Sequence, residues 1–240
     1  MNYYKSCSDN SSTNNLSLSQ DDQVVWQVLM QRWDDSTFKA IIIQSLPRLC
    51  ESIHQVLVRN YSMPTSGRIP KNQLPTPPIS PINLKYDSIT SFLEDATQRI
   101  KVTSSCLALT SYYMALISNL HYQKLSMEEE SAISKLIGRG SVQTFIICLL
   151  AANKFTEDHP YSNTAWSQIS GIPLASINAL EHCFLVCLNH RLQVSRAQFK
   201  KWVIKLAGRL NWLSTPAPIF APRPIRLIGR NSSLEFSLQK

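Results

Sequence analysis

Two stretches of the sequence decide the expected fold: C-L-L-A-A-N-K-F-T-E-D-H-P-Y-S-N-T-A-W-S-Q-I-S-G-I at residues 148–172 and I-N-A-L-E-H-C-F-L-V-C-L-N-H-R-L-Q-V-S at residues 177–195. They read as apolar helices separated by a polar, proline-containing connector. Lys154 follows Leu150 by four residues, so helical periodicity places its ammonium group on an otherwise apolar face. Glu181 lies on a comparable apolar stripe of the second stretch.

Lys154 and Glu181 each need a partner, because an unpaired charge on a buried apolar face is costly. One arrangement that satisfies them is an internal ion pair. Another is a pair of side chains that extend into solvent at the edge of a helix. Both arrangements are structural, and spacing alone favours them over a functional role.

Apolar periodicity predicts helices throughout the rest of the chain. Residues 21–59 form one or two helices, in which Pro47 can kink or restart the backbone. Ser126 and Glu129 have the spacing of a capping box, which starts a helix that ends near Gly138. The other predicted helices are residues 89–100, a central helix at 106–120, 142–155 capped by Ser141, 173–188 beginning at Pro173, and 195–212. Because no run alternates as in a sheet protein, the predicted fold class is all-α.

The composition divides the chain into a helical centre and polar arms. The predicted segments are a disordered N-terminal tail at 1–20, an N-terminal helical segment at 21–60, a Pro-rich linker at 61–86, a central helical domain at 87–192, a C-terminal helix packed on it at 193–213, and a flexible tail containing Pro and Arg at 214–240. Thr76 and Ser80 each precede a proline in the linker, which makes them candidate phosphorylation sites for a proline-directed kinase.

The overall charge and hydrophobicity describe a folded, basic protein. Hydrophobic residues make up 44% of the chain and charged residues 17%, which is typical of a chain that buries a core. The net charge of +8 attracts acidic partners, but the basic residues are scattered, so a solvated surface is favoured over a nucleic-acid patch. The N-terminus lacks a signal-peptide pattern, and the longest apolar run, 145–152, is too short for a membrane helix. We therefore expect an intracellular protein.

The sequence contains no pattern that indicates catalysis or a cofactor. Its six glycines form neither a phosphate-binding loop nor a dinucleotide-binding fingerprint, and no zinc-protease or serine-hydrolase motif occurs. Cys183, Cys187 and His190 have a helical spacing that could in principle hold a metal, but a fourth ligand is not evident. Buried, reduced thiols are the favoured interpretation, and we expect neither a metal nor a cofactor.

The pattern K-F-x-x-D-x-x-Y-S-N-x-x-W-x-x-x-x-G-I from Lys154, followed by L-E-x-x-F-L from Leu180, resembles the cyclin box of fungal P/U-type cyclins, the phosphate-system cyclin family. The resemblance covers residues 87–205, about half of the chain. It implies a single five-helix cyclin box with extra N-terminal and C-terminal helices. It also implies a non-catalytic subunit that binds and activates a cyclin-dependent protein kinase and directs its substrate choice.

The resemblance also implies which residues contact the kinase. Lys154 would donate to backbone carbonyls at the end of the kinase's mobile helix, and Glu181 would accept from its amides. Phe155 belongs to the same matched block. Asp158 would face the activation segment and partly replace its phosphate, with capping of the connector as the structural alternative. Arg99 matches a basic position of the first box helix, with a solvated charge as its alternative.

Four further residues of the matched block, Tyr161, Asn163, Trp166 and Gly171, are interpreted as turn and core residues that fix the connector.

The sequence departs from the family at two places. Val142 and Gln143 stand where the family often has His-Arg, and the M-R-x-I-L docking patch of mitotic cyclins does not occur, which makes substrate recruitment through such a patch doubtful. The main alternative function is a cyclin-fold transcription factor that binds DNA or the transcription machinery, and another is a kinase-bound adaptor that recruits without activating. We expect as partners a cyclin-dependent kinase and its protein substrates or inhibitors, without a membrane or direct nucleic-acid contact, in the nucleus or cytoplasm.

Overall fold

The computed structural model describes residues 18–33, 36–61, 85–120 and 125–212, and every regular element in these ranges is an α-helix. The helices are α1 (Gln20–Arg32), α2 (Ser36–Tyr61), α3 (Ile89–Arg99), α4 (Ser104–Asn119), α5 (Met127–Ile137), α6 (Ser141–Thr156), α7 (Asn163–Ser170), α8 (Leu174–Cys187) and α9 (Arg196–Arg209). The all-α fold class is confirmed.

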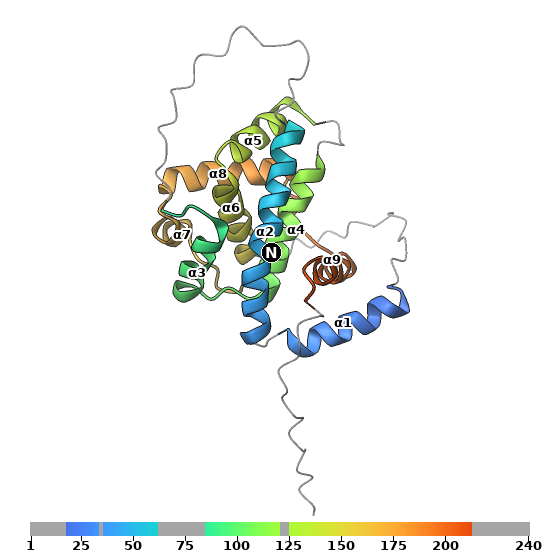
Figure 1. Ribbon diagram of the computed structural model, residues 1–240. Coiled ribbons are helices and arrows are strands. Elements are labelled where there is room, and N and C mark those ends of the chain that lie inside the picture. The colour runs from blue at the N-terminus through green and yellow to red at the C-terminus, as the bar shows by residue number, and fades with distance from the viewer. Residues whose placement is uncertain (1–17, 34–35, 62–84, 121–124, 213–240) are drawn as a thin grey trace, which may run out of the picture.

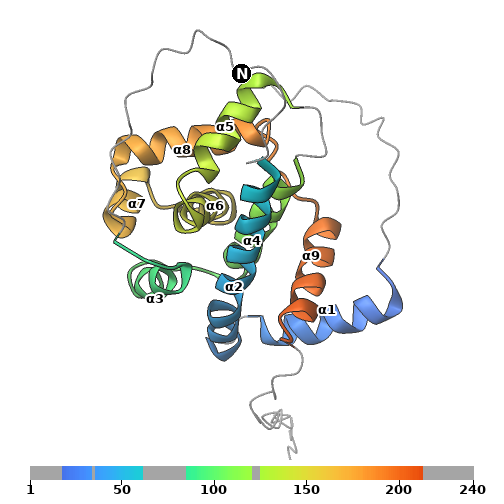
Figure 2. The ribbon, with the colours of Figure 1, turned by 45° about the horizontal axis from the view of Figure 1, so that its top comes forward.

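The centre of the molecule is built by α4 and α6, with α2 alongside them (Figure 1). Both central helices are apolar on nearly all sides, which suits helices surrounded by others. The predicted central helix at 106–120 is thus confirmed, although it begins at Ser104, where the Thr103 side chain accepts from Cys106 N. In Figures 1 and 2, α3 and α7 lie on one side of this centre, and α1 and α9 lie on the other.

The predicted central domain, 87–192, contains six helices in the described residues, where the resemblance implied five. Five of them match the helices predicted from the sequence, and the sixth is α7, which lies where the sequence predicts no helix. The capping box of α5 has the geometry that the sequence predicts, with Glu129 N donating to Ser126 Oγ over 3.2 Å and Ser126 N donating to Glu129 Oε2 over 2.7 Å. The capping pattern therefore located α5 correctly, and α5 packs against α8.

The flanking helices share one core with the central domain. Aromatic rings connect them: Trp33 lies 6.0 Å from Phe38 and 6.5 Å from Phe199, and Phe38 lies 5.6 Å from Trp212, between ring centroids. The Trp33 indole N–H also donates to Ser105 Oγ over 3.0 Å. Consequently α1, α2 and α9 are built into the fold and are not loose appendages.

Several predicted boundaries need correction. The chain is helical from Gln20, within the predicted tail, because the Ser19 side chain caps α1 by accepting from Asp22 N over 3.1 Å. Pro47 lies inside α2, and the break between the first two helices falls before Ser36.

The starts of two later helices also differ by one residue. Ser141 does not cap α6, because Gly140 takes the N-cap position with a φ of 91°, a conformation that favours glycine. Pro173 is the N-cap of α8 and not its first helical residue.

Some predictions concern residues outside the described ranges. These are the tail at 1–17, most of the linker with Thr76 and Ser80, and the tail at 213–240. Of the helices that are described, none is by itself long and apolar enough to cross a membrane, while the bent pairs α5–α6 and α7–α8 could do so jointly by length and composition alone.

Candidate functional site

Lys154 and Glu181 form an ion pair between two helices. Lys154 lies in the last turn of α6, and its Nζ donates to Oε1 of Glu181 in α8 over 2.7 Å. The Lys154 side chain is 34% exposed and that of Glu181 is 17% exposed, so the pair sits where the helix packing meets the surface. The ion pair that spacing left open is therefore present, but it lies at the edge of the helix packing and is not internal, so its charges are accessible from outside.

A third side chain fixes the orientation of the Glu181 carboxylate. Asn163 is the first residue of α7, and its Nδ2 donates to Glu181 Oε2 over 2.6 Å and to Asn178 Oδ1 over 2.8 Å. The carboxylate is therefore held by Lys154 on one oxygen and by Asn163 on the other. A carboxylate held at both oxygens loses little further freedom when a partner binds it.

The connector between α6 and α7 places Asn163. Ser162 caps α7 with its side chain, as its type and position favour. The buried Asn153 of α6 accepts from Tyr161 N over 3.1 Å, and the Tyr161 hydroxyl accepts from Lys101 N over 3.1 Å. The interpretation of Tyr161 as a residue that fixes the connector agrees with these contacts.

The turn between α7 and α8 places Glu181 opposite Asn163. Gly171 ends α7 with a φ of 75°, in the left-handed region. Trp166 is fully buried and anchors α7 to the core. Both residues thus have the turn and core roles that the sequence indicates.

The ion pair keeps hydrogen-bonding capacity for a second molecule. An ammonium group has three donors, and within the described residues Lys154 uses one of them on Glu181. A carboxylate has roughly four acceptor positions, and Glu181 accepts from Lys154 and Asn163. A segment that offers both unpaired carbonyls and unpaired amides, such as the end of a helix, would satisfy both side chains.

Exposed apolar side chains accompany the pair on the same two helices. Phe155 follows Lys154 directly and is 47% exposed. Leu174 is 39% exposed and precedes Glu181 by seven residues, which places it on the same face of α8. Large exposed apolar groups next to oriented polar groups are typical of protein interfaces.

The other two predicted contact residues, Asp158 and Arg99, lie within the described ranges and form no hydrogen bond or ion pair with Lys154 or Glu181. Asp158 is exposed in the connector after α6, and in the described part of the chain it makes no hydrogen bond or ion pair, so it does not cap the connector. Arg99 forms an ion pair with Asp95 of its own helix, with Nε 3.1 Å from Oδ1.

Asp95 belongs to a small polar cluster with Tyr86 and Lys85. Hydrogen bonds from Tyr86 and Lys85 lower the pKa of the Asp95 carboxyl, and the Tyr86 hydroxyl oxygen lies 2.9 Å from Ile169 O of α7. The cluster ties α3 to α7, so the contact of Arg99 with Asp95 is structural, and its role toward a partner stays a prediction.

The geometry adds three residues to the predicted set. The sequence predicts only a turn role for Asn163, and it does not distinguish Asn178 or Leu174 from other residues of α8. The available signal was spacing: Leu174, Asn178 and Glu181 follow one another at i, i+4 and i+7 on one helix face.

Cys183, Cys187 and His190, which have the spacing of metal ligands, lie within the described residues. Among the described residues, no group of three or more His, Cys, Asp or Glu side chains is arranged to hold a metal ion. Burial raises the pKa of the Cys187 thiol to about 12, so this thiol stays protonated, and Cys183 is a free half-buried thiol.

Comparisons with known proteins give the same family throughout. A family model described as Cyclin matches residues 43–192, beginning within α2 and thus before residue 87. The chain is 35% identical over 115 residues to G1/S-specific cyclin pas1 of Schizosaccharomyces pombe, which covers 48% of this chain and 26% of that protein. It is 27% identical over 146 residues to PHO85 cyclin-5 of Saccharomyces cerevisiae, which covers 59% of this chain and 61% of that protein.

A plant relative is similar over a shorter range. Cyclin-P4-1 of Oryza sativa is 32% identical over 78 residues, which covers 32% of this chain and 37% of that protein. The chain thus spans less than two thirds of the length of each of these curated relatives. No solved structure matches it.

Proposed function

This chain belongs to the cyclin family, and we propose that it is a regulatory subunit that binds and activates a cyclin-dependent protein kinase. The observation that carries the proposal is the ion pair of Lys154 and Glu181. It is oriented by Asn163, partly exposed, and accompanied by the exposed Phe155.

Contact with a backbone segment of the kinase explains the placement of the ion pair better than a contribution to folding stability does. A partly exposed ion pair contributes only about 0–1 kcal/mol to folding, so stability gives little reason for the precise placement of three polar side chains. The remaining donors of Lys154 fit the unpaired carbonyls at the end of a helix, and the remaining acceptor positions of Glu181 fit backbone amides. A kinase segment that contacts Lys154 and Glu181 at the same time is held in one orientation.

Binding of this kind would activate a kinase without any catalytic group from the cyclin. A protein kinase is efficient only when a lysine in its active site pairs with a glutamate on a mobile helix and the activation segment is ordered. A subunit that contacts that helix only in its active position shifts the population toward that position. The shift is limited by the difference between its affinities for the two states.

Asp158 would act on the activation segment. Its carboxylate is exposed and, in the described part of the chain, unpaired, so it can approach arginines of the kinase that otherwise bind a phosphate. We include this as a second element of the proposal.

The kinase is proposed to be of the phosphate-system type. The support is the similarity to PHO85 cyclin-5, by its name a cyclin of PHO85, together with the resemblance of the K-F-x-x-D-x-x-Y-S-N block to the phosphate-system cyclins. The protein substrates and inhibitors of that kinase are the further proposed partners.

The experiment that tests the proposal is purification of the tagged full chain from its own cells, identification of the bound kinase, and reconstitution from recombinant proteins. We expect a cyclin-dependent kinase to copurify, and its activity on a generic substrate peptide to rise when the chain is added. Absence of a bound kinase, or unchanged activity of a kinase that binds, would contradict it.

A further inference from the structure

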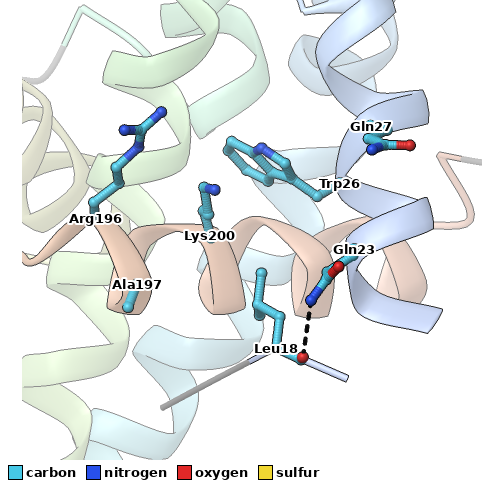
Figure 3. Close-up of a pocket in the computed structure, with 7 residues that line it drawn as sticks. All are labelled: Leu18, Gln23, Trp26, Gln27, Arg196, Ala197 and Lys200. Atoms are coloured by element: carbon cyan, nitrogen blue, oxygen red, sulfur yellow. Dashed lines mark hydrogen bonds between the residues drawn. The ribbon is translucent and has the colours of Figure 1, made fainter. Parts of the chain in front are cut away.

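α1 and α9 lie on the side of the molecule away from α7 (Figures 1 and 2), and a groove lies between them. Its volume is about 530 Å³, within the range of roughly 300–1,000 Å³ that is usual for ligand sites. Seven side chains line it: Leu18, Gln23, Trp26 and Gln27 at its α1 side, and Arg196, Ala197 and Lys200 from α9 (Figure 3).

The charges that line the groove are all positive. Arg196 and Lys200 are one helical turn apart, and their side chains extend to the same side of α9 in Figure 3. The three ion pairs of the described residues are Lys85–Asp95, Arg99–Asp95 and Lys154–Glu181, so neither cation of the groove is neutralised by one of them. The Lys200 ammonium lies 5.2 Å from the centroid of the Trp26 ring.

The groove is formed mainly by two helices that are anchored to the rest of the fold. α1 is fixed through Trp33, whose backbone carbonyl accepts from Ser104 Oγ over 3.1 Å. α9 is fixed through Trp202, whose indole N–H donates to Ala108 O over 3.1 Å. Two anchored helices therefore carry Trp26 and the two cations, so the backbone of the site is in place before a partner binds.

We propose that this groove binds a short acidic peptide segment of a second protein. Aspartate or glutamate side chains of the peptide pair with Arg196 and Lys200, and an apolar side chain between them lies against Trp26 and Leu18. Arginine binds a carboxylate through two parallel hydrogen bonds, which fix the orientation of the carboxylate in addition to neutralising its charge. The exposed amide of Gln27 is available to the peptide backbone.

The distribution of charge on α9 favours a peptide over nucleic acid. α9 carries five basic residues and no acidic one. Lys205 follows Arg196 by nine positions, which at about 100° per residue puts it on the opposite side of the helix. In agreement, Lys205 lies 5.9 Å from the Trp202 ring, whereas Lys200 faces Trp26. Lys201, Lys205 and Arg209 follow one another at i, i+4 and i+8 outside the groove. The groove itself offers two cations beside the apolar Trp26 and Leu18, which suits an acidic peptide with an apolar residue better than a phosphate backbone.

The groove is separate from the proposed kinase site. α4 lies between α6, which carries Lys154, and α9, which lines the groove. An acidic peptide can therefore bind while a kinase occupies Lys154 and Glu181. A segment recruited here would be tethered to the kinase complex, which raises its effective concentration near the active site.

The test is selection from a library of random 12-residue peptides on the immobilised full chain, followed by fluorescence anisotropy of the selected peptides. We expect enrichment of sequences with acidic residues next to an apolar one. The variant R196E/K200E is expected to weaken their binding at least about tenfold. The matched control K205E/R209E makes the same change of charge on the same helix, outside the groove, and is expected to change binding less than about threefold.

The remaining arms of the experiment separate other occupants. A phosphoserine version of a selected peptide and a 16-base-pair DNA duplex are titrated in parallel, and the acidic peptide is expected to bind more tightly than the duplex. Three results would overturn the proposal. The enriched peptides could lack acidic residues, or their binding could be unchanged in R196E/K200E. The duplex could also bind more tightly than the peptide and lose that binding in R196E/K200E. Selected sequences that match residues 1–17 of the chain itself would also overturn it.

Two measurements keep the result interpretable. Thermal unfolding shows whether R196E/K200E is folded, and R196Q/K200Q replaces it if it is not. Kinase activation by R196E/K200E is expected to equal that of the unchanged chain. A loss of peptide binding at the groove can therefore be distinguished from a loss of kinase activation.

Discussion

At the scale of single residues, the amide of Asn163 fixes the orientation of the Glu181 carboxylate, which we propose contacts the kinase. Its Nδ2 bonds Glu181 over 2.6 Å while the ammonium of Lys154 bonds the other oxygen. Without the amide, Glu181 keeps its charge but can rotate, and a partner must then restrict that rotation on binding. Asn163 is therefore a positioning residue in the proposed interface.

Replacement of Asn163 tests this role. We expect Asn163→Ala to weaken kinase binding about tenfold, because a hydrogen bond to a charged group is worth about 1.5–3 kcal/mol. The measurement is isothermal titration with the purified kinase. Asn178→Ala is the matched control, because it leaves the bond between Asn163 and Glu181 intact, and its effect is expected to stay below about threefold. Equal losses in the two variants would contradict the role.

Asp158 makes a separate prediction about the activation segment. With a kinase whose activation loop cannot be phosphorylated, Asp158→Asn is expected to lower the activity of the complex several-fold, because the carboxylate no longer pairs with the arginines of the kinase. The same variant is expected to have little effect on a kinase with a phosphorylated loop. Unchanged activity with the unphosphorylatable loop would show that Asp158 has no such role.

His54 makes the stability of the chain depend on pH. It is buried, with Nε2 3.3 Å from Ile137 O, and burial lowers its pKa below the ordinary value of 6.5. Because the unfolded chain then binds the proton more tightly, protonation favours unfolding, and the free energy of unfolding falls as pH drops below 6.5. Urea unfolding at about pH 7.5 and 5.5 measures the effect. His54→Gln, which cannot titrate, is expected to be less sensitive to this change, and an unchanged pH response would contradict the assignment.

At the scale of elements, the turn between α7 and α8 controls the distance between Asn163 and Glu181. Gly171 adopts a φ of 75° there, and a Cβ at this position would lie 3.3 Å from Lys85 Cβ. Any residue with a side chain would be strained by the backbone and crowded by Lys85. A change in the backbone of this turn would therefore shift Asn163 relative to Glu181 in the proposed kinase site.

Gly171→Ala is expected to lower the free energy of unfolding by about 1–2 kcal/mol. Chemical denaturation measures it. Gly208→Ala is the control: this glycine lies in α9 and its added Cβ would meet no heavy atom within 4 Å in the described part of the chain. There the change is expected to be neutral or stabilising, by up to about 1 kcal/mol. A Gly171→Ala variant as stable as the Gly208→Ala variant would disprove the strain.

The elements themselves were largely predictable from sequence, because their signals are local. The capping box at Ser126 located α5, and apolar spacing located α3, α4, α6, α8 and α9. The sequence did not predict α7 as a helix, nor that Gly140 and not Ser141 is the N-cap of α6. It also did not show features decided by distant contacts, since α2 joins the core through aromatic contacts such as Phe38 with Trp212, 5.6 Å apart and far apart in sequence.

At the scale of the whole molecule, two sites lie on different sides of one core. The ion pair that we propose for the kinase joins α6 to α8 and is held from α7, whereas the basic groove lies between α1 and α9. The first could be predicted from sequence because Lys154 and Glu181 contradict the apolar pattern of their helices. The second could not, because it exists only where two helices from opposite ends of the chain meet. Its components, scattered basic residues and one tryptophan, look like ordinary surface in the sequence.

The measurement that tests the central claim most directly is the affinity of the purified kinase for the double variant Lys154→Ala/Glu181→Ala. The matched control is Glu128→Ala/Lys135→Ala, which also removes one charge of each sign, from exposed positions of α5. We predict that the first variant stays folded, binds at least about 100-fold more weakly and no longer activates the kinase, while the control behaves like the unchanged chain. A double variant that is folded and binds and activates the kinase as well as the control would contradict the account.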